Sequence, residues 1–147
     1  MVLPDVNVLV HAHREDAPLH ALCRDWLHDI MESPQAFGVA DLVLSGFLRV
    51  VTHPRVFAQP TPPERAWAFV AGVRGADNCV VTNPGPRHWQ IFARLCEDAG
   101  ARGNLVPDAY LAAIALESGS EWITTDRDFS RFPGLRWRHP REIAVEG

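Results

Sequence analysis

The sequence predicts an α/β protein in which a central, mainly parallel sheet is flanked by helices on both faces. Short apolar runs alternate along the chain with longer segments whose apolar residues recur at helical spacing. Strands separated by helices in this way form βαβ units, which are right-handed and build parallel sheets. The chain has 147 residues and no fixed-period repeat or low-complexity stretch, so we expect one domain, 1–147.

The expected strands are short. Residues 2–10 form a nearly continuous apolar run, typical of a strand buried on both faces, although Pro4 disfavours ladder pairing at its own position. Further strands are expected at 36–39, 79–81 and 122–124, and an edge strand at 135–138. In sheets of this kind chemistry occurs at the carboxyl ends of the strands. Acidic residues near those ends therefore become the candidates for a site.

Helices are expected between these strands. The segment 18–32 has a clear 3.6-residue period, and Asp41 resembles a cap before a helix over 42–51. A proline-rich loop at 53–63 precedes a helix that begins at Pro62 or Pro63. Two more helices are expected over 86–99, ended by Gly100, and over 107–117, ended by Gly119. The helical stripes place Trp26, Trp67 and Trp89 in the core.

Composition excludes several classes of protein. The net charge of −4 argues against a generic polyanion binder, and all 14 basic residues are Arg, which excludes mechanisms that need a Lys. Cys23, Cys79 and Cys96 are scattered without a C-x-x-C motif, which argues against a zinc site or a disulfide scaffold and favours a reducing compartment. No signal peptide or apolar run of membrane-spanning length is present, so we expect a cytoplasmic protein without a membrane partner.

Acidic residues occupy three places where a strand ends or a helix begins. Asp5 interrupts the first apolar run, and Asn7, two residues further on, is expected on the same face. Asp108 lies in the first turn of the helix opened by Pro107, and Asp126 and Asp128 follow the strand at 122–124. Taken singly, Asp108 is also explained by the helix dipole, and Asp126 and Asp128 by turn formation. A carboxylate within the first apolar run is costly to bury without compensation.

Carboxylates gathered in a partly dry site repel one another, and a hard divalent cation among them removes that penalty. Magnesium prefers oxygen ligands and is commonly held by a few carboxylates together with substrate phosphate. It activates water for attack on phosphorus and offsets the charge that develops on the phosphoryl oxygens. The pattern therefore predicts a metal-dependent phosphodiester hydrolase.

Four segments, in order along the chain, resemble the PIN-domain family and, within it, the VapC-type toxins of toxin–antitoxin systems: residues 3–10, 42–51, 104–115 and 122–129. The resemblance implies a three-layer PIN-like fold and cleavage of RNA by a type II toxin that depends on Mg²⁺ or Mn²⁺. It also implies a cognate VapB-type antitoxin as partner. Small toxins of this kind often pair, so we expect a homodimer.

The resemblance also implies roles for individual residues. Asp5, Asp108 and Asp126 correspond to the family's catalytic metal ligands, with Asn7, Thr124 and Asp128 assisting. Many family members carry a Glu where this chain has Gly46. Its absence would weaken metal binding or transfer the duty to Asp41 or Asp128.

Two questions stay open at this stage. Arg136 and Arg138 lie in a C-terminal stretch of arginines interleaved with aromatics, which fits either an RNA-binding surface or a solvated face over core aromatics. Gly46 also leaves open a catalytically silent PIN-like module that binds RNA or protein. A phospho-acceptor signalling domain is disfavoured because the chain lacks the late Lys that such domains need.

Overall fold

The structure is a computed structural model that describes residues 1–146, with side chains as far as residue 143. The first half of the chain forms β1 (Val2–Pro4), α1 (Val6–His13), α2 (His20–Glu32), β2 (Phe37–Val39), α3 (Asp41–Val51) and α4 (Pro63–Arg74). The second half forms β3 (Cys79–Val81), α5 (His88–Ala99), α6 (Leu105–Glu117), β4 (Glu121–Ile123), the 3-10 helix η1 (Arg127–Arg131), β5 (Trp137–Arg138) and α7 (Pro140–Glu146).

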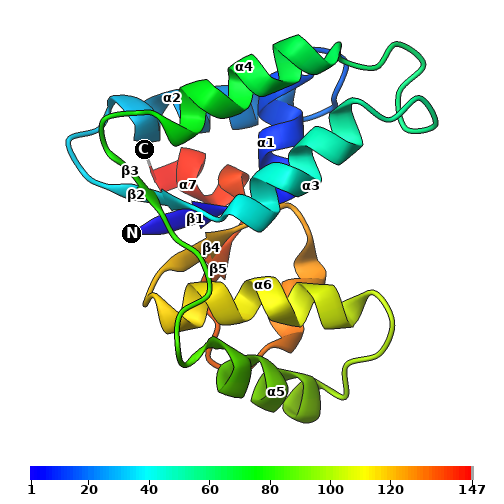
Figure 1. The fold of residues 1–147 in the computed structure, drawn as a ribbon. Coiled ribbons are helices and arrows are strands. Elements are labelled where there is room, and N and C mark those ends of the chain that lie inside the picture. The colour runs from blue at the N-terminus through cyan, green and yellow to red at the C-terminus, as the bar shows by residue number, and fades with distance from the viewer. Residues whose placement is uncertain (147) are drawn as a thin grey trace.

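All strand pairs are parallel, as the sequence predicts. Strands β1, β4 and β5 form a three-stranded sheet in the order β1-β4-β5, and β2 and β3 form a two-stranded sheet. The two sheets meet where β1 packs beside β2. Helices α1 to α4 and α7 lie on one side of these strands, and α5 and α6 lie on the other (Figure 1). The predicted α/β fold with a parallel sheet between helical layers is therefore confirmed, and β5 is the predicted edge strand.

The prediction of one strand over residues 2–10 is wrong. The strand ends at Pro4, and α1 starts at Val6 after Asp5, which has extended backbone angles and accepts a hydrogen bond from the Val6 N–H as the N-cap. A short apolar run fits a buried helix as well as a buried strand. Pro4 is paired with Ile123 in the ladder despite lacking an N–H, and it is the Asp5 cap that begins the helix. Asp5 and Asn7 therefore lie at a strand-to-helix junction.

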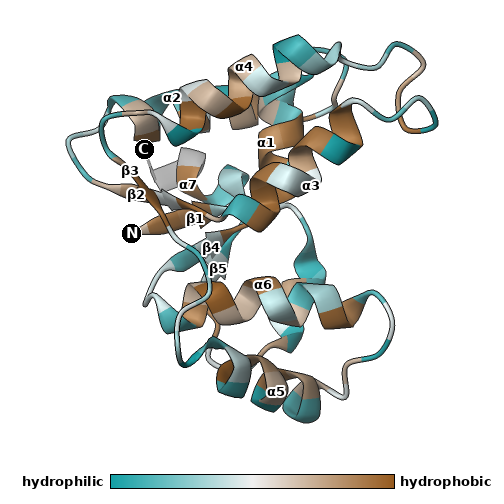
Figure 2. Ribbon diagram, viewed as in Figure 1, coloured by the Kyte–Doolittle hydropathy of each residue, from teal (hydrophilic) through white to brown (hydrophobic). Residues whose placement is uncertain are grey.

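The core lies between the sheet and the helices on each side. Leu3, Trp122 and Ile123 are fully buried in the strands. Helix α6 covers them with small side chains, since Ala109, Ala112, Ala113 and Ala115 are all buried. Small residues allow a helix backbone to approach the sheet closely, and Figure 2 shows apolar residues concentrated on the strands and on the helix faces toward them.

Three details of the predicted helices need correction. Trp67 and Trp89 are 62% and 70% exposed, so only Trp26 of the three tryptophans belongs to the core. The N-cap of α3 is Ala40, and Asp41 is the first residue of the helix. Helix α6 begins at Leu105, which places Pro107 and Asp108 in its first turn. The buried faces of α4 and α5 are instead formed by small and aliphatic residues such as Ala66, Val70 and Leu95, with His88.

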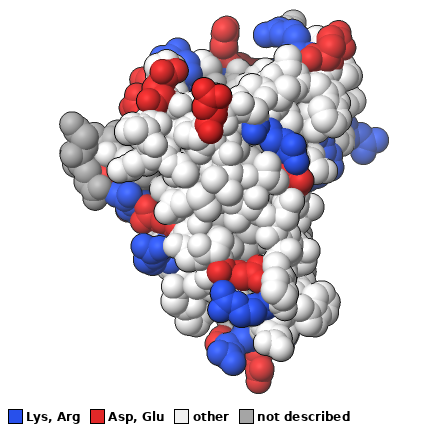
Figure 3. All heavy atoms as spheres, turned by 60° about the vertical axis from the view of Figure 1, so that its left-hand side comes forward, with Lys and Arg blue, Asp and Glu red and all other residues white. Residues whose placement is uncertain are grey.

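The surface of the described residues is chemically mixed. Figure 3 turns the side that carries β2, β3 and the N-terminus toward the viewer, and charged residues of both signs are scattered there around a broad uncharged middle. Such a face offers no continuous basic strip to a phosphate backbone. None of the helices in residues 1–146 combines the length and the apolar character needed to cross a bilayer.

Candidate active site

The parallel pairing of β1 with β4 builds the centre of the candidate site. Pro4 lies opposite Ile123, and the Asp5 N–H donates to the Ile123 carbonyl at 2.8 Å. The next residue of each strand, Asp5 or Thr124, therefore emerges beside the other at the carboxyl end of the sheet. Both side chains are buried, with Asp5 only 5% exposed.

A hydrogen-bonded network fixes the Asp5 carboxylate. Its Oδ1 accepts from the Val6 N–H at 2.6 Å, and its Oδ2 accepts from the Thr124 hydroxyl at 2.8 Å and from Asn7 Nδ2 at 3.2 Å. Asn7 also donates to Thr124 Oγ1 and accepts from the Thr125 N–H. A carboxylate offers about four acceptor positions. Three of those of Asp5 are used, so the carboxylate is oriented and one position is left for another partner.

Asp108 and Asp126 share a cavity with Asp5. The cavity has a volume of about 370 Å³ and is lined by all three aspartates together with Asn7. Asp126 caps η1 through its Oδ1, which accepts from the Asp128 N–H at 2.9 Å, and its own N–H donates to Thr124 Oγ1. Three carboxylates from β1, α6 and the end of β4 therefore meet at one edge of the sheet.

The electrostatics of the cavity show the cost of this arrangement. Burial, with the charges of Asp108 and Asp126 adding to it, raises the pKa of Asp5 to about 6, although the hydrogen bonds from Thr124 and Val6 oppose the rise. Burial and the charges of Asp126 and Asp128 raise the pKa of Asp108 to about 6 as well. Uncompensated carboxylates with raised pKa values in one cavity are typical of a functional site rather than of a structural ion pair.

Two cationic or basic side chains line the same cavity, and sequence reasoning did not single out either as part of the site. Arg49 comes from α3 and His11 from α1. Burial lowers the pKa of His11, whose Nδ1 accepts from the Leu19 N–H at 3.3 Å. The sequence could have indicated Arg49, because residues three apart are neighbours on a helix and Gly46 lies three residues earlier in the segment that resembles the family.

The oxygen donors of the cavity suit a magnesium ion that receives some of its ligands from the substrate. No three His, Cys, Asp or Glu side chains within the described part of the chain converge tightly enough to form a complete metal cluster. Magnesium is usually held by one or two carboxylates, several waters and substrate phosphate, so a complete protein cage is not required. The all-oxygen chemistry and the uncompensated charge of Asp5 and Asp108 fit such an ion.

The remaining candidates lie outside the lining of this cavity. Asp41 is held by Arg74 and Asn83, so it does not replace the missing Glu. Asp128 is close enough for its charge to raise the pKa of Asp108. Arg136 donates to the Gly119 carbonyl, and Arg138 forms a two-pronged ion pair with Glu121 at 2.8 Å. A role for Arg136, Arg138 and Asp128 toward substrate or metal stays a prediction.

Gly46 itself lines the cavity, on the turn of α3 that faces α1. A Cβ at this position would lie 2.9 Å from Val6 Cγ2, closer than ordinary contact. Val6 therefore occupies part of the space into which a larger side chain at position 46 would extend.

Several known proteins resemble this chain in sequence. Residues 2–135 match the PIN domain family. The chain is 47% identical over 140 residues to the VapC ribonuclease Mb2897 of Mycobacterium bovis, with 95% of each chain covered. It is 43% identical to Ribonuclease VapC31 of Mycobacterium tuberculosis, covering 95% of this chain and 99% of the relative.

Solved structures share the fold at low sequence identity. VapBC2 from Rickettsia felis, bound to a DNA fragment from its promoter, matches with a TM-score of 0.69 and 15% identity over 95% of this chain and 98% of that one. VapC20 of Mycobacterium tuberculosis, a toxin that cleaves the sarcin-ricin loop, matches with a TM-score of 0.66 and 17% identity over 92% and 99%.

Proposed function

This chain belongs to the PIN-domain family and, within it, to the VapC ribonucleases, and we propose that Asp5, Asp108 and Asp126 form its catalytic centre. As a VapC-type protein it is the toxin component of a toxin–antitoxin system and an endoribonuclease. Ribonucleases of this family depend on a divalent metal ion. We assign that ion as Mg²⁺, with Mn²⁺ as the substitute, because the donors are oxygens.

The three aspartates would hold the metal ion, and the metal ion would supply the positive charge that attracts the scissile phosphate. When bound, Mg²⁺ lowers the pKa of water and offsets the charge that develops on phosphoryl oxygens during attack on phosphorus. Thr124 and Asn7 hold the Asp5 carboxylate in one orientation through their hydrogen bonds. Asp108 accepts no hydrogen bond from any residue that the structure describes, so both of its oxygens are free for metal or water.

One observation carries this assignment. Asp5 lies more than a hundred residues before Asp108 and Asp126 along the chain, yet all three line one cavity, and burial and mutual repulsion raise the pKa of Asp5 and Asp108. A protein gains nothing in stability by burying like charges together, so a cation in the functional state is the physical explanation.

The partners follow from the same family membership. The solved neighbours include VapBC toxin–antitoxin complexes from Rickettsia felis and Salmonella typhimurium, which supports a VapB-type antitoxin as the partner of this chain. RNA is the substrate. A homodimer and a cytoplasmic location are part of the proposal and rest on the sequence alone.

The second candidate is a catalytically silent module with the same fold. Gly46 in place of the usual Glu and the lack of a complete three-ligand cluster in residues 1–146 favour it. Calorimetric titration with Mg²⁺ separates the two candidates. Heat of binding near millimolar metal that disappears in Asp108→Asn supports the enzyme, and no binding in either protein supports the silent module.

The direct test is RNA cleavage with Mg²⁺. We expect purified protein to cut RNA at defined positions, and chelator to abolish the cleavage. Asp5→Asn and Asp108→Asn should each lower the rate by at least about a hundredfold, because each removes a charge from the metal site. Asp29→Asn, which changes a carboxylate that is 83% exposed on α2, is the matched control and should cleave like the wild type. Equal cleavage by Asp5→Asn and the wild type would contradict the assignment.

A further inference from the structure

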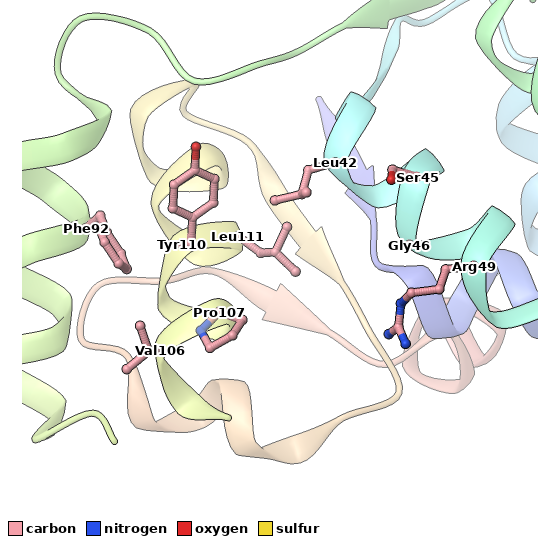
Figure 4. Close-up of a pocket in the computed structure, with 9 residues that line it drawn as sticks. All are labelled: Leu42, Ser45, Gly46, Arg49, Phe92, Val106, Pro107, Tyr110 and Leu111. Carbon is pink, nitrogen blue, oxygen red and sulfur yellow. The ribbon is translucent and has the colours of Figure 1, made fainter. Parts of the chain in front are cut away.

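A second cavity adjoins the acidic one. It has a volume of about 580 Å³ and lies between α3 and α6, with Phe92 of α5 at its far end (Figure 4). Leu42 of α3 and Leu111 of α6 point toward each other across it, and Tyr110 stands between Leu111 and Phe92 (Figure 4). This pocket, called the apolar pocket below, is lined mainly by apolar and aromatic side chains and by no carboxylate, unlike the acidic cavity beside it.

The same two helices line both cavities. On α3, Leu42, Ser45, Gly46 and Arg49 are spaced three or four residues apart and form one face, of which Gly46 and Arg49 border both cavities. On α6, Leu111 borders both, one turn beyond Asp108. The apolar pocket therefore adjoins the acidic cavity and shares Gly46, Arg49 and Leu111 with it.

Arg49 stands at the boundary without a partner. It forms no ion pair or hydrogen bond with any residue that the structure describes, although it lines a cavity with three aspartates. Arg74 and Arg138 are paired with carboxylates, and Arg49 differs from the other arginines that form no ion pair among the described residues in that it lines the acidic cavity. A guanidinium free at such a boundary can bind an anion in two-pronged fashion, and phosphate is the anion that this reaction brings.

Gly46, Arg49 and Leu111 line both cavities, so the two cavities meet at these three residues. The Val6 side chain of α1 lies against the place where a Cβ of Gly46 would be, with its Cγ2 2.9 Å from that position, so the space beside Gly46 is filled. Arg49 and Leu111 are therefore the side chains that an occupant of both cavities would contact at the boundary.

We propose that the apolar pocket seats one unpaired nucleobase of the RNA substrate, with Arg49 binding the backbone phosphate next to that base. The proposal rests on the ribonuclease function proposed above, and it says where the nucleotide next to the cleaved bond binds. From the apolar pocket past Arg49 to the acidic cavity, the lining changes from apolar side chains to a cation and then to carboxylates. A nucleotide within an RNA strand matches this order, because its flat base, its phosphate and the neighbouring scissile phosphate would face the apolar lining, Arg49 and the metal-binding carboxylates in turn.

The aromatic residues of the pocket support a base as the occupant. Tyr110 and Phe92 meet edge to face, with ring centroids 5.3 Å apart, and Tyr110 also packs against His88 at 4.3 Å. These contacts hold the Tyr110 ring in place as a platform. Sequence-specific proteins read single-stranded RNA by stacking splayed bases on aromatic or Arg planes. Ser45 adds an exposed hydroxyl to the α3 wall for a hydrogen bond to the base edge.

The test separates binding from cleavage. In an Asp5→Asn background, we would measure by fluorescence anisotropy the affinity for a short single-stranded oligoribonucleotide of mixed sequence and for its counterpart with abasic ribose in the central positions. We expect the first to bind roughly tenfold more tightly. Ser45→Phe, which fills the pocket from an exposed position, should remove that difference. Arg49→Gln should weaken binding of both RNAs by roughly tenfold, because it removes a phosphate contact.

Matched controls are available on exposed surfaces away from both cavities. Ala68→Phe adds the same bulk on α4, and Arg55→Gln removes a charge from the loop before it, and both should bind like the background protein. Equal affinity for the two RNAs, or an unaltered difference in Ser45→Phe, would overturn the proposal. So would a Ser45→Phe protein that binds RNA normally but escapes the antitoxin, since the pocket would then be a peptide site. Base-dependent binding by a wild type that cleaves no RNA would refute the ribonuclease function and leave the pocket assignment standing.

Discussion

Asp5 combines structural and electrostatic duties in one side chain. It caps α1, it joins α1 to the end of β4 through Thr124, and it carries a negative charge in a buried place. The first two duties would be served by an uncharged acceptor. The third is unfavourable for folding, and it becomes understandable only if the charge is used on a cation.

The raised pKa of Asp5 gives a prediction about stability in the absence of metal. The pKa is about 6 in the folded protein and ordinarily 3.8, so the folded state binds the proton more tightly. Stability contributed by this group therefore rises as the pH falls through that interval. Between about pH 7.5 and about pH 4, the free energy of unfolding of the wild type should rise relative to Asp5→Asn by on the order of 2–3 kcal/mol.

The comparison with Asp5→Asn is needed because histidines act in the opposite direction. Burial lowers the pKa values of His11, His13 and His139, so their contributions to stability are lost as the pH falls. These contributions are common to both proteins and cancel in the difference. Chemical denaturation with chelator present at several pH values measures it. A difference in the free energy of unfolding that does not change with pH would show that the pKa of Asp5 is not raised in the folded protein.

Single residues were predictable where their chemistry conflicts with their surroundings. Asp5 stands out because an acid in an apolar run has no ordinary explanation, and Asp126 because it follows a strand. Arg49 and His11 were missed, since an Arg or His on a helix has many ordinary explanations and only the packing of α3 and α1 around the cavity reveals their position. The exposure of Trp67 and Trp89 was missed because periodicity shows a stripe but not which stripe is covered.

At the scale of elements, the ends of helices and strands depend on local chemistry that the pattern of apolar residues does not show. Gly100 takes a left-handed conformation, with φ of 59°, and ends α5 where the sequence predicts. The change from β1 to α1 was missed because it depends on the Asp5 cap, whereas the apolar pattern runs through without a break. The hydrophobic period was therefore informative for long helices and ambiguous for this short segment.

Asn78 connects three elements that the sequence does not show to be related. Its Nδ2 lies 2.8 to 2.9 Å from the carbonyl oxygens of Ile30, Ser33 and Gln35, which share its two N–H donors, so the residue before β3 holds the end of α2 and the approach to β2. Asn78→Ala should destabilise the fold by about 1–3 kcal/mol, because carbonyls lose their donor. Thermal unfolding followed by circular dichroism measures the loss.

Asn78→Asp provides the matched comparison for that prediction. It keeps the size of the side chain but replaces the N–H donor with a second carboxylate oxygen facing the carbonyls, so it should be less stable than Asn78→Ala. If Asn78→Asp unfolds at the same temperature as the wild type, the three hydrogen bonds do not hold α2 to β2.

At the scale of the whole molecule, the question is which of the two exposed tryptophans, Trp67 or Trp89, marks a surface that a second copy covers. Trp89 lies on α5, in edge-to-face contact with Phe92, which lines the apolar pocket, whereas Trp67 lies on α4 on the other side of the sheet (Figure 1). Large aromatic side chains left exposed often mark surfaces that another chain covers. A symmetric dimer uses the same patch on both subunits, so the proposed homodimer would bury one of these faces and leave the other exposed.

We expect the homodimer to form through α5. Trp89 is the more exposed of the two tryptophans, and pairing there would place the apolar pockets of both subunits near the interface. Trp89→Arg should convert the dimer into a monomer by placing a charge in the apolar contact, whereas Trp67→Arg should leave it a dimer. Light scattering after size-exclusion chromatography measures the mass of each. Dissociation by Trp67→Arg alone would place the interface on α4, and a wild type that is monomeric at high concentration would remove the dimer from the proposal.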